Sequence, residues 1–271
     1  DLKPCRIYML ESVSADPRAL LRVERMVRRV GMTMNDVRVY SREEAPQVVR
    51  DLKSWPWNDA SSDLPLQHQR AWVFVSMVME PAPDADTVLQ HRPDDVPEDA
   101  LKHALGYIVH VRDTHAPNRD EAMDMVCWNT QDFGLMIGCP HGCQYCGQGR
   151  HGHSITMAVN IEEWIDGVVG PTIEHFPEQK CFRLLGWGAD IATFEPEYDA
   201  FAPFLAKLAE YPDHYGYFHT AGNNVDWVKD VANRDRLIGV WSLTTEFGGS
   251  EIEPGAPSPA ERIEAARKCQ E

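Results

Sequence analysis

The sequence has no long hydrophobic run. Hydrophobic residues make up 43% of its 271 residues, yet no apolar stretch approaches the roughly 18 to 20 residues that a membrane-spanning helix requires. The N-terminal stretch DLKPCRIYML carries charges and a proline where a signal peptide has its apolar segment. We therefore expect a cytoplasmic protein with no membrane partner.

Basic residues are scarce relative to acidic ones. The chain carries 26 lysines and arginines against 42 aspartates and glutamates, a formal net charge of −16. A surface this negative repels phosphates at long range, so tight binding of nucleic acid would require a local basic groove. The charge therefore favours a small-molecule substrate and disfavours a nucleic-acid partner.

Cysteine is also uncommon, but three of the seven cysteines stand together in the segment CPHGCQYC. An odd number with such a cluster indicates metal ligation in a reducing compartment. One interpretation is a zinc site, whose fourth ligand would be His141, His151 or His153. The other is a [4Fe–4S] cluster in which three thiolates hold three irons and the fourth iron stays open to an external chelating molecule. We favour the cluster, with ligands Cys139, Cys143 and Cys146.

The N-terminal part predicts a small α/β unit. Strands are expected at residues 6–10, 37–40, 72–79 and 107–111, with a helix in PRALLRVERMVRRVG that ends at Gly31. The polar, proline-rich residues 80–99 are expected to form an exposed loop or an excursion. We predict an N-terminal domain over residues 1–125 and a second domain over residues 126–271.

The C-terminal part alternates strand and helix patterns four times. The expected strands are FGLMIGC, KCFRLLGWG, YGYFHTAG and IGVWSLTTE; the expected helices are NIEEWIDGVVGPTIEHF, FAPFLAKLAEY, VDWVKDVAN and SPAERIEAARKCQE. Asn160 is the expected N-cap of the first helix, which should kink near Pro171. Four such units imply a parallel sheet, either barrel-like or open and doubly wound. Its functional site should lie at the carboxyl ends of the strands, where the cysteine segment follows the first strand.

The spacing CxxxCxxC, with Tyr145 before the third cysteine and a strand before the motif, resembles the radical SAM superfamily and its partial (βα) barrel. The resemblance implies a [4Fe–4S] cluster whose open iron binds S-adenosyl-L-methionine. Reductive cleavage would then give a 5′-deoxyadenosyl radical that abstracts hydrogen from a substrate. It also implies an external one-electron donor of the flavodoxin or ferredoxin type.

Four further segments resemble, in order, those of the spore photoproduct lyase family: KPCRIYMLESVSADPRALLRVERM, RLLGWGADI, WSLTTEF and EPGAPSPAERIEAARK. The match is that of a remote relative. Members of that family reverse a thymine–thymine photolesion in DNA with a cysteine that returns hydrogen, and a lysine helps to hold the cofactor. Here no cysteine stands between Gly186 and Asp190, the lysine position falls near Ala221, and Cys181 lies at the wrong end of its strand. We therefore favour hydrogen abstraction from a small-molecule or nucleoside-like substrate. A DNA lesion repair lyase and a non-catalytic metal protein remain as alternatives.

The resemblance also implies cofactor contacts. The backbone around Gly186, Trp187 and Gly188 is placed to bind the amino group of the cofactor, and Tyr145 stands beside the cluster ligands. Ser242 and Thr244, two residues apart on a strand, would point the same way and could bond the carboxylate or ribose, or only neighbouring backbone. Trp187 could wall the site or pack against a helix.

Other polar residues stand near the same strand ends. Asp190 is the candidate catalytic carboxylate, for substrate proton transfer or orientation, with helix capping as its other interpretation. His219 could be a core histidine. Tyr215 or Tyr217 could supply a redox-active phenol, with at least one of the two in the core. The segment HGHS could contact substrate or form a solvated loop.

Superfamily barrels usually carry six βα units, and four are found before Glu271. We expect the strands that close the barrel, with part of the adenine and substrate contacts, to be missing from the chain as given. Without a hydrogen-returning cysteine, we expect the cofactor to be consumed in each turnover.

Overall fold

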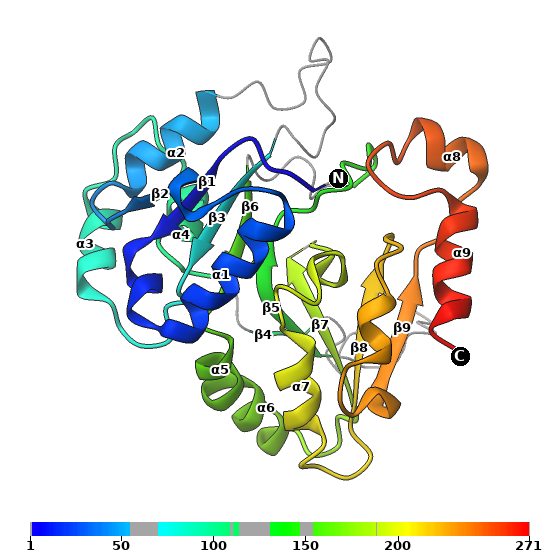
Figure 1. The fold of residues 1–271 in the computed structure, drawn as a ribbon. Helices are drawn as coiled ribbons and strands as arrows, with labels where there is room; N and C mark the ends of the chain where they lie inside the picture. Colours follow the sequence, from blue (N-terminus) through cyan, green and yellow to red (C-terminus); the bar gives the residue numbers. More distant parts are fainter. Residues whose placement is uncertain are drawn as a thin grey trace, which may run out of the picture.

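The computed structural model describes residues 2–54, 70–108, 111–113, 131–146, 154–187 and 189–270. In these ranges the strands are β1 (Ile7–Leu10), β2 (Val37–Tyr40), β3 (Ala71–Val75), β4 (Val111–Asp113), β5 (Gln131–Ile137), β6 (Ser154–Ala158), β7 (Cys181–Trp187), β8 (Tyr215–Thr220) and β9 (Leu237–Trp241). They form one sheet in the order β2-β1-β3-β6-β5-β7-β8-β9, with β4 beside β5. Figure 1 shows β1 to β3 and β8 to β9 at opposite sides of the molecule.

The sheet consists of two parallel blocks. The N-terminal block is β2, β1, β3 and β6, and the C-terminal block is β5, β7, β8 and β9. The blocks run antiparallel where Met136 and Ile137 of β5 pair with Met157 and Thr156 of β6. The predicted α/β fold with a mostly parallel sheet is confirmed. The predicted domain division remains a prediction, although strands from both ranges share this sheet through the β3–β6 pairing.

The α-helices of the described residues are α1 (Pro17–Arg29), α2 (Ala45–Ser54), α3 (Pro83–Gln90), α4 (Glu98–Ala104), α5 (Ile161–Trp164), α6 (Gly170–His175), α7 (Phe201–Leu208), α8 (Glu246–Glu251) and α9 (Pro259–Lys268). Shorter helical turns are η1 (Glu11–Ala15), η2 (Met34–Asp36), η6 (Ile165–Val169), η7 (Ile191–Phe194), η8 (Asp226–Lys229) and η9 (Arg234–Arg236). None of these helices is long and apolar enough to cross a membrane. Figure 1 shows α8 and α9 beyond β9, at one edge of the sheet.

Helix α1 forms where the sequence predicts it. The Asp16 side chain accepts a hydrogen bond from the backbone N–H of Arg18, and Pro17 occupies the first turn, where its missing N–H costs nothing. Gly31 follows the helix with a φ of 71°, a left-handed conformation that glycine adopts without strain.

An aromatic cluster forms the core between the C-terminal block and its helices. The ring of Phe133 in β5 stacks on Phe182 in β7 at 5.5 Å and contacts Trp164 and Phe204 edge-on. All four side chains are fully buried. Each such side chain contributes roughly 1.5–3 kcal/mol of hydrophobic stabilisation. The packing fixes one face of this block against its helices.

Two segments differ from the sequence prediction. Residues 80–99 contain α3 and the start of α4, not only loop. Strand β6, which begins at the serine of HGHS, was not predicted, because its pattern spans only five residues. The first three residues of HGHS lie outside the described part of the chain.

Asn160 stands at the expected helix start but does not cap it. Its amide accepts from the Met77 N–H at 2.8 Å and donates to the Met77 carbonyl at 3.1 Å, so it holds the segment after β3. The predicted kink near Pro171 takes the form of the π-helical turn η6 just before it. A helix predicted in VDWVKDVAN is only the 3₁₀ turn η8. The strand expected at 107–111 overlaps β4 at Val111, and residues 109–110 lie outside the described part of the chain.

Candidate functional site

The cysteine loop begins at the carboxyl end of β5. Gly138 follows the strand with a φ of 94°, and a side chain there would collide with the Ser154 carbonyl, so only glycine allows this turn. The loop that follows carries Cys139, Cys143 and Cys146, all partly buried free thiols. They stand at the edge of the sheet where the sequence places the site.

Arg70, just before β3, brings positive charge to this loop. Its side chain is 2% exposed and donates to the carbonyl of Cys139. Burial lowers the pKa of Arg70, while the charges of the three cysteines oppose that shift. Arg70 therefore lies in electrostatic contact with all three thiols, a role that sequence reasoning missed.

Burial favours the protonated form of two of these thiols, Cys139 and Cys143. Burial, and then the charge of Asp190, raises the pKa of Cys139 to about 12. Burial, followed by the charge of Glu253, raises the pKa of Cys143. A bound cation reverses this preference, because a metal-bound thiol loses its proton.

The donor set suits a cluster better than a single ion. Among the described residues, no three His, Cys, Asp or Glu side chains are placed to hold one metal ion. A zinc ion needs all its ligands about 2.0–2.3 Å from one centre, whereas each thiolate of a [4Fe–4S] cluster bonds a different iron. His141, a candidate zinc ligand, is occupied elsewhere, and His151 and His153 lie outside the described residues. Three soft thiolates on one loop therefore fit an iron–sulfur cluster.

A buried hydrogen-bonded pair ties the cysteine loop to the ends of β7 and β8. His141 Nε2 lies 2.8 Å from Asp190 Oδ2, and both side chains are buried. The same carboxylate oxygen accepts from Thr220 Oγ1 at 2.6 Å and from the Ala221 N–H at 3.0 Å. Burial raises the pKa of Asp190, but these hydrogen bonds outweigh it and the net shift is downward. Asp190 thus joins the loop to the ends of two strands as an ionised group.

The second oxygen of Asp190 is available. Its Oδ1 is buried and accepts no hydrogen bond from any described residue. The side chain does not cap η7 either. A buried carboxylate oxygen without a donor is costly, so this atom is suited to receive a donor from a bound molecule.

A second set of contacts holds the other end of the cysteine loop. The N–H of Gln144 donates to the Ile252 carbonyl at 2.9 Å. The Tyr145 hydroxyl donates to Glu253, and this hydrogen bond raises the pKa of Tyr145. Glu253 also pairs with Arg262, which is 0% exposed and donates to the Ser242 carbonyl at 3.0 Å. The segment after α8 and the start of α9 therefore support the loop.

The predicted cofactor contacts lie around the same edge. Trp187 ends β7 and pairs in register with Ile137 of β5, with Gly186 before it; Gly188 lies outside the described residues. Ser242 follows β9, and its N–H donates to the Thr220 carbonyl at 2.9 Å. Thr244 lies two residues further, against Gly248 of α8. The strand ends therefore bring the described candidates to the edge that carries the cysteines.

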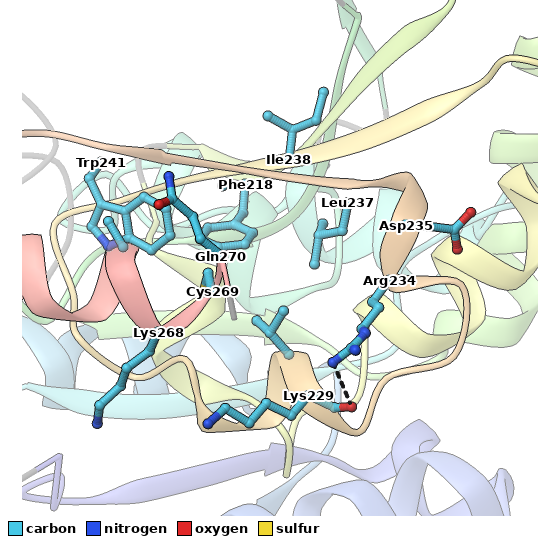
Figure 2. Close-up of a pocket in the computed structure, with 13 residues that line it drawn as sticks. Phe218, Lys229, Arg234, Asp235, Leu237, Ile238, Trp241, Lys268, Cys269 and Gln270 are labelled. Carbon is cyan, nitrogen blue, oxygen red and sulfur yellow. Dashed lines mark hydrogen bonds between the residues drawn. The ribbon is translucent and has the colours of Figure 1, made fainter.

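A separate cavity of about 580 Å³ lies beside β9, between η8 and α9. Trp241 and Phe218 line it. The centroids of their two rings lie 5.4 Å apart on the helix side of the sheet. Figure 2 shows Lys229 and Lys268 extending away from these rings. The motif cysteines do not line this cavity.

Comparison with solved structures finds this fold in spore photoproduct lyase. The enzyme complexed with dinucleoside spore photoproduct matches with a TM-score of 0.61 and 14% identity, over 99% of this chain and 65% of that chain. A double mutant with bound AdoMet and dinucleoside spore photoproduct matches with a TM-score of 0.62 and 15% identity, over 99% and 65% of the two chains. A tyrosine-to-phenylalanine mutant matches with a TM-score of 0.61 and 15% identity, over 100% and 65%.

No family model and no curated protein matches the sequence. The chain spans 65% of the length of these solved structures. At identities of 14–15% the likeness shows the fold alone. The protein therefore has the fold of spore photoproduct lyase over nearly its whole described length.

Proposed function

We propose that this protein is a radical SAM enzyme that abstracts hydrogen from a small-molecule or nucleoside-like substrate. One observation carries the proposal: Cys139, Cys143 and Cys146 occupy a single loop at the carboxyl end of β5, in a fold shared with spore photoproduct lyase. Two residues of the spore photoproduct lyase family have no counterpart here: the cysteine that returns hydrogen, between Gly186 and Asp190, and the lysine that helps to hold the cofactor, near Ala221. A partial (βα) barrel is part of the proposal.

The three thiolates would hold a [4Fe–4S] cluster and Gly186, Trp187, Gly188, Ser242 and Thr244 would contact S-adenosyl-L-methionine. When bound, these groups supply a 5′-deoxyadenosyl radical after reduction by an external donor of the flavodoxin or ferredoxin type. Arg70 and His141 hold the cysteine loop in place. Tyr145 connects it to Glu253 at the other end.

Asp190 is the candidate group for substrate orientation or proton transfer. Its Oδ2 is held by His141 and Thr220, while Oδ1 is free to accept a hydrogen bond. Since Asp190 also interacts electrostatically with Cys139, a ligand bonded to Oδ1 would lie beside the cysteine loop. No cysteine stands between Gly186 and Asp190 in the sequence, so we propose that the cofactor is consumed in each turnover.

A DNA lesion repair lyase is the second candidate, and the fold likeness favours it. The charge of −16 argues against a DNA substrate. Incubation with lesion-containing oligonucleotides and, separately, with metabolite pools distinguishes the two candidates by which substrate is consumed.

The radical SAM proposal is tested by anaerobic reconstitution with iron and sulfide, followed by reduction and chromatography of 5′-deoxyadenosine. We expect 5′-deoxyadenosine from the wild-type protein. If the protein binds iron but does not cleave the cofactor, the result favours the non-catalytic metal protein.

The source of the hydrogen on the product is tested in deuterated water, with the substrate that the metabolite pools identify. One solvent deuterium per turnover on the former radical carbon would implicate an exchangeable donor and contradict cofactor consumption. The Asp190→Asn variant should still cleave the cofactor but lose product.

A further inference from the structure

Arg70 differs from the other buried arginines of the protein. In the described residues the buried arginine side chains are Arg22, Arg70 and Arg262. Arg22 and Arg262 each pair with a glutamate. Arg70 pairs with no carboxylate of the described residues, and its guanidinium donates to the carbonyl of Cys139 instead. A buried cation without a counter-ion is costly, so Arg70 is expected to serve an anion that these residues do not supply.

The junction of the two strand blocks places Arg70 beside the cysteine loop. Because β5 and β6 are antiparallel, the end of β5 lies beside the start of β6. Strand β6 pairs in turn with β3, with Ser154 opposite Ala71. The residue directly before β3 therefore meets the loop directly after β5. The backbone of Arg70 is also held, because its carbonyl accepts from the Cys5 N–H at 3.1 Å.

The electrostatic partners of Arg70 are the three motif cysteines. Burial lowers the pKa of Arg70, and the charges that oppose this shift are those of Cys139, Cys143 and Cys146. In the part of the chain that the structure describes, no carboxylate contributes to it. The negative charge that Arg70 meets is therefore the charge that these thiols acquire when they bind a metal.

The other charged groups beside the loop do not replace Arg70. Burial, and then the charge of Asp190, raises the pKa of Cys139, and the charge of Arg70 opposes them. Arg262 also acts on the motif, but it is paired with Glu253, whose charge acts in the opposite direction. Within the described ranges, Arg70 is thus the buried cation at this loop that no carboxylate balances.

A cation at this position favours the reduced form of an iron–sulfur cluster. Reduction takes one electron from an external donor and neither forms nor breaks a bond, so the site gains one negative charge. The potential of such a cluster depends on its net charge and on the groups around it. Charges interact more strongly in a buried site than in water. Arg70 is 2% exposed, and a guanidinium keeps its charge at any pH at which the protein is folded.

We propose that Arg70 is a positioning residue that balances the charge of the cluster and raises its reduction potential. This inference rests on the proposed function, in which Cys139, Cys143 and Cys146 hold a [4Fe–4S] cluster. It gives the residue before β3 a part in the redox step of a site whose ligands follow β5. With Arg70 in place, a weaker external reductant suffices to load the cluster with its electron.

The test is a redox measurement on the anaerobically reconstituted full chain, without S-adenosyl-L-methionine. The protein is poised at a series of potentials with dithionite and mediator dyes, and the reduced cluster is quantified by electron paramagnetic resonance. In Arg70→Gln the ratio of reduced to oxidised cluster at one potential should fall about tenfold, a shift of about 59 mV for one electron. Arg70→Lys keeps the charge, and its ratio should stay within about threefold of the wild type. An unchanged ratio in Arg70→Gln, or an equal fall in both variants, overturns the proposal.

Arg50→Gln is the matched control. Arg50 is an exposed arginine of α2 that pairs with Asp95, and its charge is not among those that act on Cys139 or Cys143. The substitution makes the same change in net charge as Arg70→Gln and should leave the potential unchanged. A shift of equal size in the control would assign the effect to net charge and overturn the proposal.

Iron content and the stability of the apo-protein separate the charge of Arg70 from a structural role. If Arg70→Gln assembles no cluster, retention of iron in Arg70→Lys supports the proposal, and loss of iron in both variants overturns it. The unfolding midpoint of the apo-protein is measured by circular dichroism. A lower midpoint in Arg70→Gln with an unchanged potential would show that the residue only supports the loop, which also overturns the proposal.

Production of 5′-deoxyadenosine is measured separately, so that this inference and the proposed function can fail independently. A cluster whose potential depends on Arg70, without cofactor cleavage, would contradict only the proposed function. Cofactor cleavage with a potential that does not depend on Arg70 would contradict only this inference. A wild-type chain that assembles no cluster would contradict both.

Discussion

The two blocks of the sheet are built from similar strands but are buried differently. Every residue of β1 and β3 is buried, so both faces of these strands are covered. In β8 the burial alternates, and in β9 most residues are accessible. Since successive residues point to opposite faces, β8 and β9 carry accessible side chains on a face that is covered in β1 and β3. The comparison leads us to propose that the N-terminal block contributes more to stability and that the C-terminal block carries the site.

The largest expected effect sharpens this division. Cys143→Ala should abolish 5′-deoxyadenosine production, because one iron of the cluster loses its thiolate, while the unfolding midpoint of the apo-protein changes little. Production is measured by chromatography and the midpoint by circular dichroism. The same loss is expected for Cys139→Ala and Cys146→Ala.

The control variants are Cys181→Ala and Cys269→Ala. Cys181 begins β7, and Cys269 directly follows α9. Both should retain cofactor cleavage. Cleavage by the triple variant of the motif cysteines would show that the cluster assignment is wrong.

The second prediction compares the cores of the two blocks. Phe74 in β3 is 0% exposed and packs edge-on against Trp72, so Phe74→Ala should lower the free energy of unfolding by about 3–5 kcal/mol. Val240 in β9 is 38% exposed, and Val240→Ala should cost no more than about 0.5 kcal/mol. Urea denaturation measures both. Similar costs at the two positions would remove the distinction between the blocks.

The third prediction concerns the contacts by which α1 meets the C-terminal half. Arg22 is 1% exposed, donates to the Val159 carbonyl at 2.9 Å and pairs with Glu162 at 2.9 Å. Arg22→Ala should cost about 3 kcal/mol, because buried polar partners lose their donor. Arg25 forms a more accessible pair with Asp199, and Arg25→Ala should cost less than about 1 kcal/mol.

These two variants also test whether the blocks unfold together. If Arg22→Ala gives a single cooperative transition at lower urea, α1 couples the blocks. Two separate transitions would show that they are independent units, as the predicted domain division implies.

The smallest expected effect is a pH dependence of the stability that comes from Glu195, the residue directly after η7. Glu195 is 3% exposed and accepts from the N–H groups of Ala200 and Asp199. Burial raises its pKa from 4.5 to about 7. The folded protein therefore binds more protons than the unfolded chain between these values, so stability should fall as pH rises through this window, by at most roughly 1.4 kcal/mol per pH unit.

Urea denaturation between pH 5 and 8 measures this slope in the wild-type protein and in Glu195→Gln. The variant cannot ionise and should lack the contribution of this group. An identical slope in both proteins would assign the pH dependence to other residues.

Local patterns in the sequence predicted the elements but only part of their pairing. The helix α1, the strands of the C-terminal block and the position of the cysteine loop all follow from spacing over a few residues, because helix and strand periodicities are local. Strand β6 was missed because its pattern spans only five residues. Its place between β3 and β5 depends on two partners, one of them distant in the chain.

The sequence by itself determined that three thiols lie together at a strand end, since their spacing confines them to one loop. Only the tertiary structure decided what surrounds them. His141 meets Asp190 across 49 residues, Arg70 meets Cys139 across 69, and Tyr145 meets Glu253 across 108. No local periodicity encodes such pairs, because they depend on how the chain returns to the same edge of the sheet. Strand register acts in the same way: Asp132, Arg183 and Tyr217 stand far apart in the sequence, and the pairing of β5, β7 and β8 places them in one row.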